Sequence, residues 1–220
     1  LLGSATENQG TAPVPFRKES DGIFVIYTKL SSGNIYFTDA LEDGVNYTVD
    51  SSGRLIEGDE AYNVEAEENV VRLTLNFNAK TISKDIISGV RMIWGATFDV
   101  IADMQYVGNG SFKKENVNIK FVDPNDPTTN PPSWLTWVEE RYYFISTING
   151  ADVCWGRGDN VSAEQPGESE PATFYELHEF AWSQWDHLWK MSHSLNKKTC
   201  TVTIETNANN MMIHSFSDVK

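Results

Sequence analysis

The segment Val71-Arg-Leu-Thr-Leu-Asn-Phe77 alternates strictly between apolar and polar side chains. Successive side chains of a β-strand point to opposite faces, so this period of two predicts a strand with one buried face. Similar short runs, rich in β-branched and aromatic residues, recur along the chain between Gly, Asn, Asp and Ser. They are residues 22–30, 34–37, 46–49, 54–56, 90–94, 104–107, 117–121, 141–148 and 199–204. Many short strands separated by turn residues are typical of sandwich or barrel sheets.

An internal repeat divides the chain. The stretch 70–82 resembles the stretch 199–211, since each is an alternating strand followed by Asn-Ala and a second apolar run. If each copy closes a domain, the boundary lies near Gly89, with an N-terminal unit at 16–88 and a larger C-terminal unit at 89–220. Residues 1–15 are small and polar with two prolines, and they predict a flexible linker. The expected fold class is therefore all-β, with tandem β-sandwich units of the immunoglobulin-like kind.

Residues 173–192 depart from the strand pattern. Neither Gly nor Pro interrupts them, and Thr173 with Glu176 fits a helix capping box. Apolar side chains recur at steps of three and four residues, as on one face of a helix: Phe174, Leu177, Ala181, Trp185 and Leu188. The local pattern predicts one helix in the C-terminal unit, although the same aromatic and apolar runs also suit strands.

The charge balance narrows the classes of partner. The chain carries 31 acidic and 17 basic residues, a formal net charge of −14. A surface of that sign repels phosphate backbones and anionic lipids, so we expect no nucleic acid partner and consider neutral sugars, cations and proteins. The sequence contains no run of about 18 apolar residues, the length that would predict a membrane-spanning helix. Any export signal or lipid-modified cysteine is therefore expected outside these residues.

The sequence contains no familiar catalytic or metal-binding motif. Gly-x-Ser-x-Gly, the phosphate-binding GxxxxGK and His-Glu-x-x-His are missing, and we expect the four histidines to be exposed. Asp123 and Asp126 offer oxygens for calcium, although a solvated turn is the simpler interpretation. Acidic pairs such as Glu139 and Glu140 suit a glycosidase only if they face each other across a sugar. The expectation is a protein without catalytic residues, bound metal or cofactor.

The two cysteines, Cys154 and Cys200, lie among apolar and β-branched residues. Such surroundings are typical of buried thiols, so two free cysteines are the first interpretation and one disulfide is the second. A CxxC-type metal site is absent from the sequence.

Tryptophan is the most informative residue type, because six of the seven follow residue 130. Sugar rings present apolar C–H faces that stack on aromatic rings, while polar side chains fix their orientation. Trp134 and Trp137 flank the end of a loop, 123–132, with four prolines in ten residues, where a large exposed ring indicates a ligand contact. The competing interpretation is that these rings fold back and cap the sandwich. Trp155 precedes the flexible Gly156-Arg-Gly158 and is a further candidate for ligand binding.

The remaining candidates lie within residues 173–192. Trp182 and Trp189 fall towards the edge of the predicted apolar face, and Asp186 is an interleaved polar partner, so all three join the predicted ligand-binding set. Trp185 falls at the centre of that face and is expected in the core. A stripe of this kind is also typical of a core helix, and the two interpretations stay open here.

Several motifs together resemble one family, the surface glycan-binding lipoproteins of Bacteroidetes polysaccharide-utilisation systems, of the starch-utilisation accessory type. The motifs are Gly33-Asn-Ile-Tyr-Phe37, Leu73-Thr-Leu-Asn-Phe77 with Thr81-Ile-Ser, Gly89-Val-Arg-Met-Ile-Trp-Gly95, Met104-Gln-Tyr-Val-Gly-Asn-Gly110, Arg141-Tyr-Tyr-Phe144 and Trp155-Gly156. They cover the chain from about Gly22 to Phe216. The resemblance implies tandem β-sandwich domains in a lipid-anchored protein on the outer face of the cell outer membrane, which holds glycan for partner enzymes and a transporter. It assigns no binding residue, because the sugar contacts of that family vary between members.

The sequence thus predicts a secreted, non-catalytic protein that binds polysaccharide or oligosaccharide at the cell surface. One alternative is a pilus or adhesin subunit, which would expose an unpaired strand edge or donate a strand. The other is a glycoside hydrolase, which would hold two carboxyl groups across a cleft.

Overall fold

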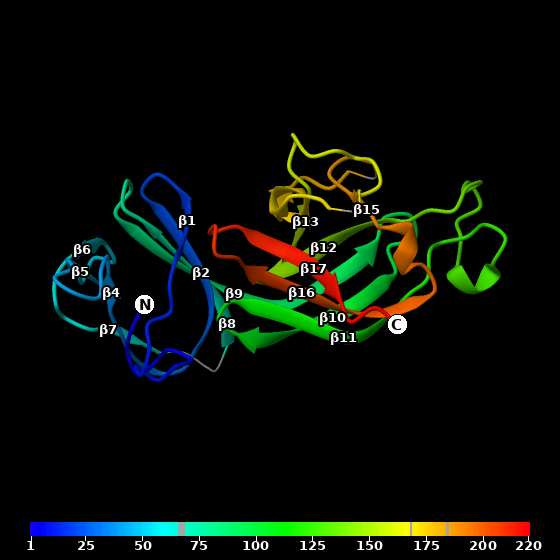
Figure 1. The fold of residues 1–220 in the computed structure, drawn as a ribbon. Helices are drawn as coiled ribbons and strands as arrows, with labels where there is room; N and C mark the ends of the chain where they lie inside the picture. The colour runs from blue at the N-terminus through cyan, green and yellow to red at the C-terminus, as the bar shows by residue number, and fades with distance from the viewer. Residues whose placement is uncertain (66–68, 168, 184) are drawn as a thin grey trace. The chain divides into compact units, whose positions relative to one another are not determined.

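The protein is all-β throughout the part of the chain that the computed structural model describes. The described residues are 1–65, 69–167, 169–183 and 185–220. Figure 1 shows strands joined by turns and loops, with helical structure confined to short 3₁₀ turns. Three 3₁₀ helices occur among the described residues: Pro127–Thr129, Ala172–Tyr175 and His193–Leu195. The all-β fold class is confirmed.

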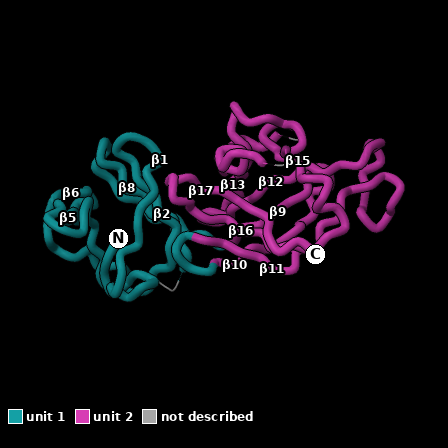
Figure 2. Tube along the Cα trace, viewed as in Figure 1, with its two compact units in different colours: residues 1–88, 107–110 teal, residues 89–106, 111–220 magenta. Residues whose placement is uncertain are grey.

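Two compact units share the chain (Figure 2). Unit 1 holds residues 1–88 together with 107–110, and unit 2 holds residues 89–106 together with 111–220. The division falls at Gly89, the residue near which the internal repeat places it, and the short segment 107–110 returns to unit 1.

The main sheet of unit 1 is antiparallel, with the strand order β1-β2-β8-β9. Its strands are β1 (Arg17–Ser20), β2 (Ile23–Leu30), β8 (Asn69–Asn76) and the first half of β9 (Thr81–Trp94). Two smaller antiparallel sheets consist of β3 (Gly33–Ile35) with β7 (Tyr62–Val64), and of β4 (Phe37–Thr38), β5 (Asn46–Val49) and β6 (Leu55–Glu57).

The core of unit 1 draws on all three of these sheets. In β8 the alternation of the sequence becomes an alternation of burial, because Val71, Leu73 and Leu75 are buried while the residues between them are only partly covered. Phe37 of β4 and Leu55 of β6 belong to the same buried cluster. Burial of each large apolar side chain contributes about 1.5–3 kcal/mol to the free energy of folding.

Residues 1–15 are not a flexible linker, so this prediction is wrong. Leu1, Ala5 and Val14 are buried within the core of unit 1. The backbones of Leu2 and Tyr36 exchange two hydrogen bonds, of 3.0 and 2.8 Å. The polar composition is misleading because turns separate the few apolar residues that enter the core, and no periodic pattern results.

The sheet of unit 2 begins with the second half of β9, which pairs with β10 (Val100–Gly108). It continues in antiparallel order through β11 (Ser111–Ile119), β16 (Lys198–Thr206) and β17 (Met212–Ser217). A second group of strands gathers on β12 (Arg141–Ile148), which also pairs with β9. It consists of β13 (Ala151–Gly156) and β15 (Trp189–Lys190) beside β12, and of β14 (His178–Phe180) beside β13.

Aromatic rings from β12, β15 and β17 fill the core of unit 2. Trp189 stacks on Tyr142 with ring centroids 5.7 Å apart, and His214 of β17 lies 4.4 Å from the Trp189 ring. His214 is buried, which corrects the expectation of exposed histidines. Burial lowers the pKa of His214 to about 3, so the ring is neutral. Its Nδ1–H then donates to the Tyr175 carbonyl oxygen at 2.9 Å, and its Nε2 accepts from the Tyr142 hydroxyl at 2.7 Å.

The helix predicted over 173–192 is wrong for the described residues of that segment; residue 184 lies outside them. The segment instead contains one 3₁₀ turn and the short strands β14 and β15. Its tryptophans share no face, because Trp189 is fully buried beside β12 whereas Trp182 and Trp185 are exposed. Pairing with β12 and β13 therefore overrides the local helical spacing.

Cys154 of β13 and Cys200 of β16 are free thiols, which confirms the first interpretation of the pair. Desolvation raises the pKa of Cys154 and raises the pKa of Cys200 to about 11. Both side chains are therefore protonated and poorly nucleophilic at neutral pH.

Candidate functional site

Three tryptophans gather on the surface of unit 2, and we refer to Trp134, Trp137 and Trp185 as the tryptophan cluster. The ring centroid of Trp134 lies 6.0 Å from that of Trp137 and 5.7 Å from that of Trp185. The Trp137 and Trp185 centroids are 6.4 Å apart. The residues remain 43%, 43% and 47% exposed, respectively. Exposing several large apolar rings to water is unfavourable, so a contiguous exposed group of this kind is typical of an interaction surface.

One buried side chain anchors the loop that carries two of these rings. Leu135 lies between Trp134 and Trp137 in sequence and is buried, and its backbone N–H donates to the Pro132 carbonyl at 3.0 Å. Leu135 is thus buried, while the tryptophans on either side keep much of their surface exposed. The exposure of Trp134 and Trp137 favours surface rings over caps folded onto the sandwich end.

Glu139 organises the polar side of the tryptophan cluster. Its side chain is almost completely buried, and its backbone exchanges two hydrogen bonds with Val122. Carboxylate oxygen Oε2 accepts from the Trp137 indole N–H at 2.8 Å. The other oxygen, Oε1, accepts from the Arg141 backbone N–H at 3.0 Å and lies 3.3 Å from Arg141 Nε. One carboxylate therefore holds an indole ring and a guanidinium in fixed positions.

Arg141 connects this carboxylate to the third ring. Its guanidinium carbon lies 4.9 Å from the Trp185 ring centroid, within the range of a cation–π contact. Arg141 is the first residue of β12, so its backbone belongs to a sheet strand rather than to a loop. The guanidinium adds hydrogen-bond donors next to the exposed rings.

The loop between β14 and β15 carries Trp185 and is held by a tight contact with the end of β13. The Arg157 backbone N–H donates to the His187 carbonyl at 2.8 Å, and its Nε donates to the Leu188 carbonyl at 3.1 Å. A Cβ atom on Gly156 would lie 2.3 Å from the His187 carbonyl oxygen, closer than such atoms approach. The close approach that positions Trp185 therefore requires glycine at residue 156.

Two of the predicted ligand-binding tryptophans lie in the interior, so they do not belong to the candidate surface. Trp155 is 2% exposed and Trp189 is 0% exposed. The Trp189 indole N–H donates to the Phe174 carbonyl at 2.7 Å, which satisfies its only polar group inside the core. A ring without accessible surface cannot stack on a ligand, so both side chains are structural.

The other two predicted residues are exposed but differ in position. Trp182 makes its ring contact with Phe98, with centroids 5.4 Å apart, and is not one of the three rings of the tryptophan cluster. Asp186 follows Trp185 directly, and its Oδ2 accepts from the Ser183 hydroxyl at 3.0 Å. The structure thus brings Trp134 and Trp137 together and buries Trp155 and Trp189, while Asp186 is adjacent to Trp185 in sequence.

The acidic pairs that suggest calcium or hydrolysis have structural partners. Asp126 caps a 3₁₀ turn and forms an ion pair with Lys120 at 2.8 Å. Hydrogen bonds from Lys120 and Thr128 lower the pKa of Asp126 to about 2. Glu140 accepts a hydrogen bond of 2.6 Å from Gln165 through Oε1. Among the described residues, no group of three or more His, Cys, Asp or Glu side chains is arranged to hold a metal ion.

Sequence reasoning misses three members of this site, namely Trp185, Glu139 and Arg141. Two of them, Glu139 and Arg141, could have been found from their spacing, because Trp137, Glu139 and Arg141 follow each other at steps of two. In an extended backbone, residues at that spacing point to the same face, so their side chains are expected to lie together. Trp185 has no comparable signal, because its helical spacing predicts a core position.

The described residues contain no helix that is both long and apolar enough to cross a membrane. Neither the comparison with protein-family models nor that with curated proteins finds a match for this chain.

Proposed function

We propose that unit 2 binds carbohydrate through the tryptophan cluster and catalyses no reaction on it. The observation that supports this proposal is the set of three exposed indole rings, of which Trp137 is hydrogen-bonded to Glu139 and Trp185 contacts the Arg141 guanidinium. Apolar C–H faces of a sugar stack on such rings, and the Arg141 guanidinium and the Asp186 carboxylate supply a donor and an acceptor for hydroxyl groups.

The angles between the rings favour one shape of glycan. The Trp134 and Trp185 planes meet at 76°, and the Trp137 and Trp185 planes meet at 42°. A flat crystalline polysaccharide would need rings in one plane. Tilted rings suit a soluble, curved or branched chain whose sugars present their faces in different directions.

In this proposal the protein is secreted and lipid-anchored, and it faces outwards from the cell outer membrane. There it holds polysaccharide or oligosaccharide for partner enzymes and a transporter. The support for this location is the resemblance of the strand motifs to surface glycan-binding lipoproteins. The net charge of −14 agrees with a neutral ligand, because it disfavours polyanions.

Binding is tested with a panel of soluble and insoluble glycans, by pull-down and then by calorimetry on the best ligand. Trp134→Ala, Trp137→Ala and Trp185→Ala should each weaken binding about tenfold, since one stacked ring is worth roughly 1–3 kcal/mol. Phe98→Ala is the matched control, because Phe98 is a 52% exposed aromatic residue outside the cluster. Unchanged binding by all three tryptophan variants, or an equal loss in the control, contradicts the proposal.

The absence of catalysis is tested separately on the same glycans. The proposal expects no new reducing ends during prolonged incubation of the pure protein with a bound glycan. Sustained release that grows with protein concentration would show a hydrolase instead.

A further inference from the structure

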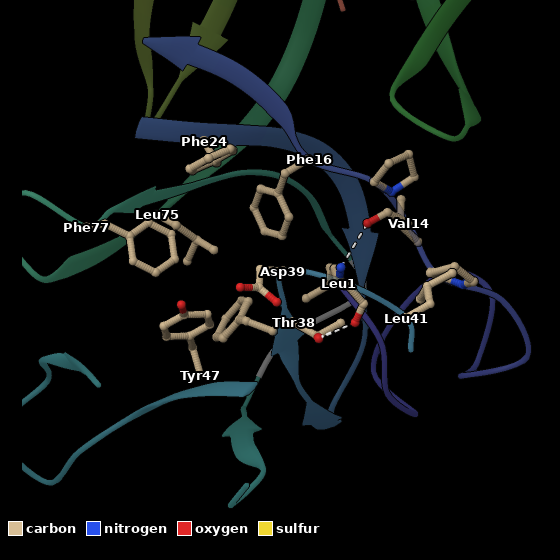
Figure 3. Close-up of a pocket in the computed structure, with 14 residues that line it drawn as sticks. Leu1, Val14, Phe16, Phe24, Thr38, Asp39, Leu41, Tyr47, Leu75 and Phe77 are labelled. Carbon is tan, nitrogen blue, oxygen red and sulfur yellow. Dashed lines mark hydrogen bonds between the residues drawn. The ribbon is translucent and has the colours of Figure 1, made fainter. Parts of the chain in front are cut away.

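Unit 1 contains a cavity of about 570 Å³, a size within the range of small-molecule sites. Figure 3 shows that it opens between the main sheet, the small sheet with β4 and β5, and the segment before β1. Aromatic rings form much of its wall: Phe16, Phe24, Phe37, Tyr47 and Phe77. The proposed carbohydrate site lies in unit 2 and does not include this cavity.

The rings support one another and therefore form a stable wall. Phe77 makes T-shaped contacts with two neighbouring rings, with centroid distances of 5.8 Å to Phe24 and 4.9 Å to Tyr47. Phe16 lies 6.2 Å from Phe37 on the other side of the opening. Aromatic faces carry negative electrostatic potential, so a ring that turns its face to the cavity attracts positive charge there.

A carboxylate lines the same cavity. Asp39 Oδ1 accepts a hydrogen bond of 2.8 Å from the Val45 backbone N–H, and among the described residues no basic side chain forms an ion pair with Asp39. Figure 3 shows the Asp39 carboxylate beside the space that Phe16 and Tyr47 border. Burial, followed by the nearby charges of Asp39 and Glu57, raises the pKa of Tyr47, so the phenol stays neutral.

Asp39 is the acidic residue among those that line the cavity, and no lysine or arginine is among the described lining residues.

We propose that this cavity binds an organic cation that carries apolar substituents, such as a quaternary ammonium group. Methyl or methylene groups around a positive nitrogen contact the aromatic wall, and the charge is compensated by the ring faces and by Asp39. An anion is repelled by the Asp39 carboxylate. A neutral apolar molecule gains the ring contacts but no attraction to the Asp39 charge.

The test uses a pair of probes that differ only in charge. Choline and 3,3-dimethylbutan-1-ol have the same shape, because a carbon atom replaces the ammonium nitrogen in the alcohol. Binding to the full chain is followed by NMR shifts of the aromatic protons of unit 1. Choline should bind saturably and about tenfold more tightly than the alcohol, the ratio that corresponds to the strength of a largely desolvated cation–π site.

Three substitutions separate charge from shape. Asp39→Asn should weaken choline binding about fivefold or more and leave the alcohol unaffected. Phe16→Leu keeps apolar volume but removes one ring face, so it should also act on choline alone. Asp43→Asn removes an equal charge from a residue that does not line the cavity and should change neither affinity. A thermal melt of each variant confirms that unit 1 is folded.

Three outcomes would overturn the proposal. Equal affinity for choline and the alcohol would mark an apolar cavity without preference for cations. Absence of saturable choline binding would show that the cavity does not bind organic cations of this kind. The same effect from Asp39→Asn and Asp43→Asn would show that the carboxylate in the cavity does not recognise the ligand. None of these outcomes bears on carbohydrate binding by unit 2.

Discussion

Trp185 and Trp189 are four residues apart in sequence and serve opposite purposes. Trp185 exposes nearly half of its surface in the tryptophan cluster, and Trp189 lies in the core against Tyr142 and His214. Trp189→Ala should therefore lower the free energy of unfolding by about 3–5 kcal/mol. Trp185→Ala should leave it nearly unchanged and weaken glycan binding instead. Thermal melts and calorimetry on both variants check the pair, and a large loss of stability in Trp185→Ala would contradict its assignment to the surface.

Glu139 acts on the proposed ligand through other residues and is a positioning residue. Glu139→Gln retains the shape of the side chain but removes the charge that holds the Trp137 indole and Arg141 together. We expect glycan affinity to fall about threefold to tenfold, since hydrogen bonds to a charged group contribute roughly 1.5–3 kcal/mol and the amide replaces only part of them.

The neighbouring Glu140→Gln is the control for this change, because Glu140 accepts from Gln165 and not from the cluster. It should retain the affinity of the unmodified protein. An aromatic proton NMR spectrum in which the Trp137 indole N–H shifts in Glu139→Gln, but not in Glu140→Gln, would identify the positioning role. Equal affinities for all three proteins would show that the carboxylate is only structural.

At the scale of elements, the contact between the end of β13 and the loop before β15 positions Trp185. Gly156→Ala introduces a Cβ atom 2.3 Å from the His187 carbonyl, so the loop must move. We expect weaker glycan binding together with a lower melting temperature. Gly89→Ala is the control, because a Cβ atom there meets nothing within 4 Å, and its melting temperature should change little. A Gly156→Ala variant with unaltered binding and stability would show that the loop tolerates displacement.

The strands with one buried face could be predicted from the sequence. Residues 22–30, 71–77 and 141–148 correspond to β2, β8 and β12 within two residues at either end. In β8 burial on one side imposes a period of two on the side chains, and β2 and β12 are marked by their β-branched and aromatic residues. The pattern weakens where both faces are covered or where a polar side chain is buried. Strand β17 is an example, because the polar residue His214 occupies a core position and interrupts the apolar pattern from which a strand would be predicted.

Two features lie beyond sequence reasoning for a different physical reason. The segment 173–192 has helical spacing, but the partners that decide its conformation, β12 and β13, lie many residues before it. The cavity of unit 1 joins residues from six separate stretches of chain, so no local sequence pattern predicts it. The tryptophan cluster is an intermediate case, because two of its rings were predicted as a ligand contact from their loop and the third was not.

For the molecule as a whole, His214 makes stability depend on pH. Its pKa in the folded state is about 3, below the value of about 6.5 expected in an unfolded chain, so the unfolded state binds the proton more readily. The stabilisation of the neutral ring is complete above about pH 6.5 and is lost as the pH falls towards about 3, at about 1.4 kcal/mol per pH unit. His214→Gln should be less stable at neutral pH but should lose stability less steeply in acid. Parallel slopes for the two proteins would contradict this assignment.

Salt distinguishes the two proposed sites. Glycan binding by stacking and neutral hydrogen bonds should change less than about twofold between about 0.1 and about 1 M salt, although the Debye length falls from about 10 Å to about 3 Å. Choline binding in unit 1 should weaken over the same range, because its attraction to the Asp39 carboxylate is screened. Calorimetric titrations at both salt concentrations check this, and a steep salt dependence of glycan affinity would point to a charged ligand.

All seven tryptophans belong to unit 2, whereas the aromatic residues of unit 1 are tyrosines and phenylalanines. Light at the red edge of the aromatic absorption band excites indole and not phenol, so intrinsic fluorescence reports on unit 2 alone, while circular dichroism senses the strands of both units. If the units melt separately, the two optical signals will give transitions that do not coincide. The distribution of one amino acid thus provides a built-in label for one half of the protein.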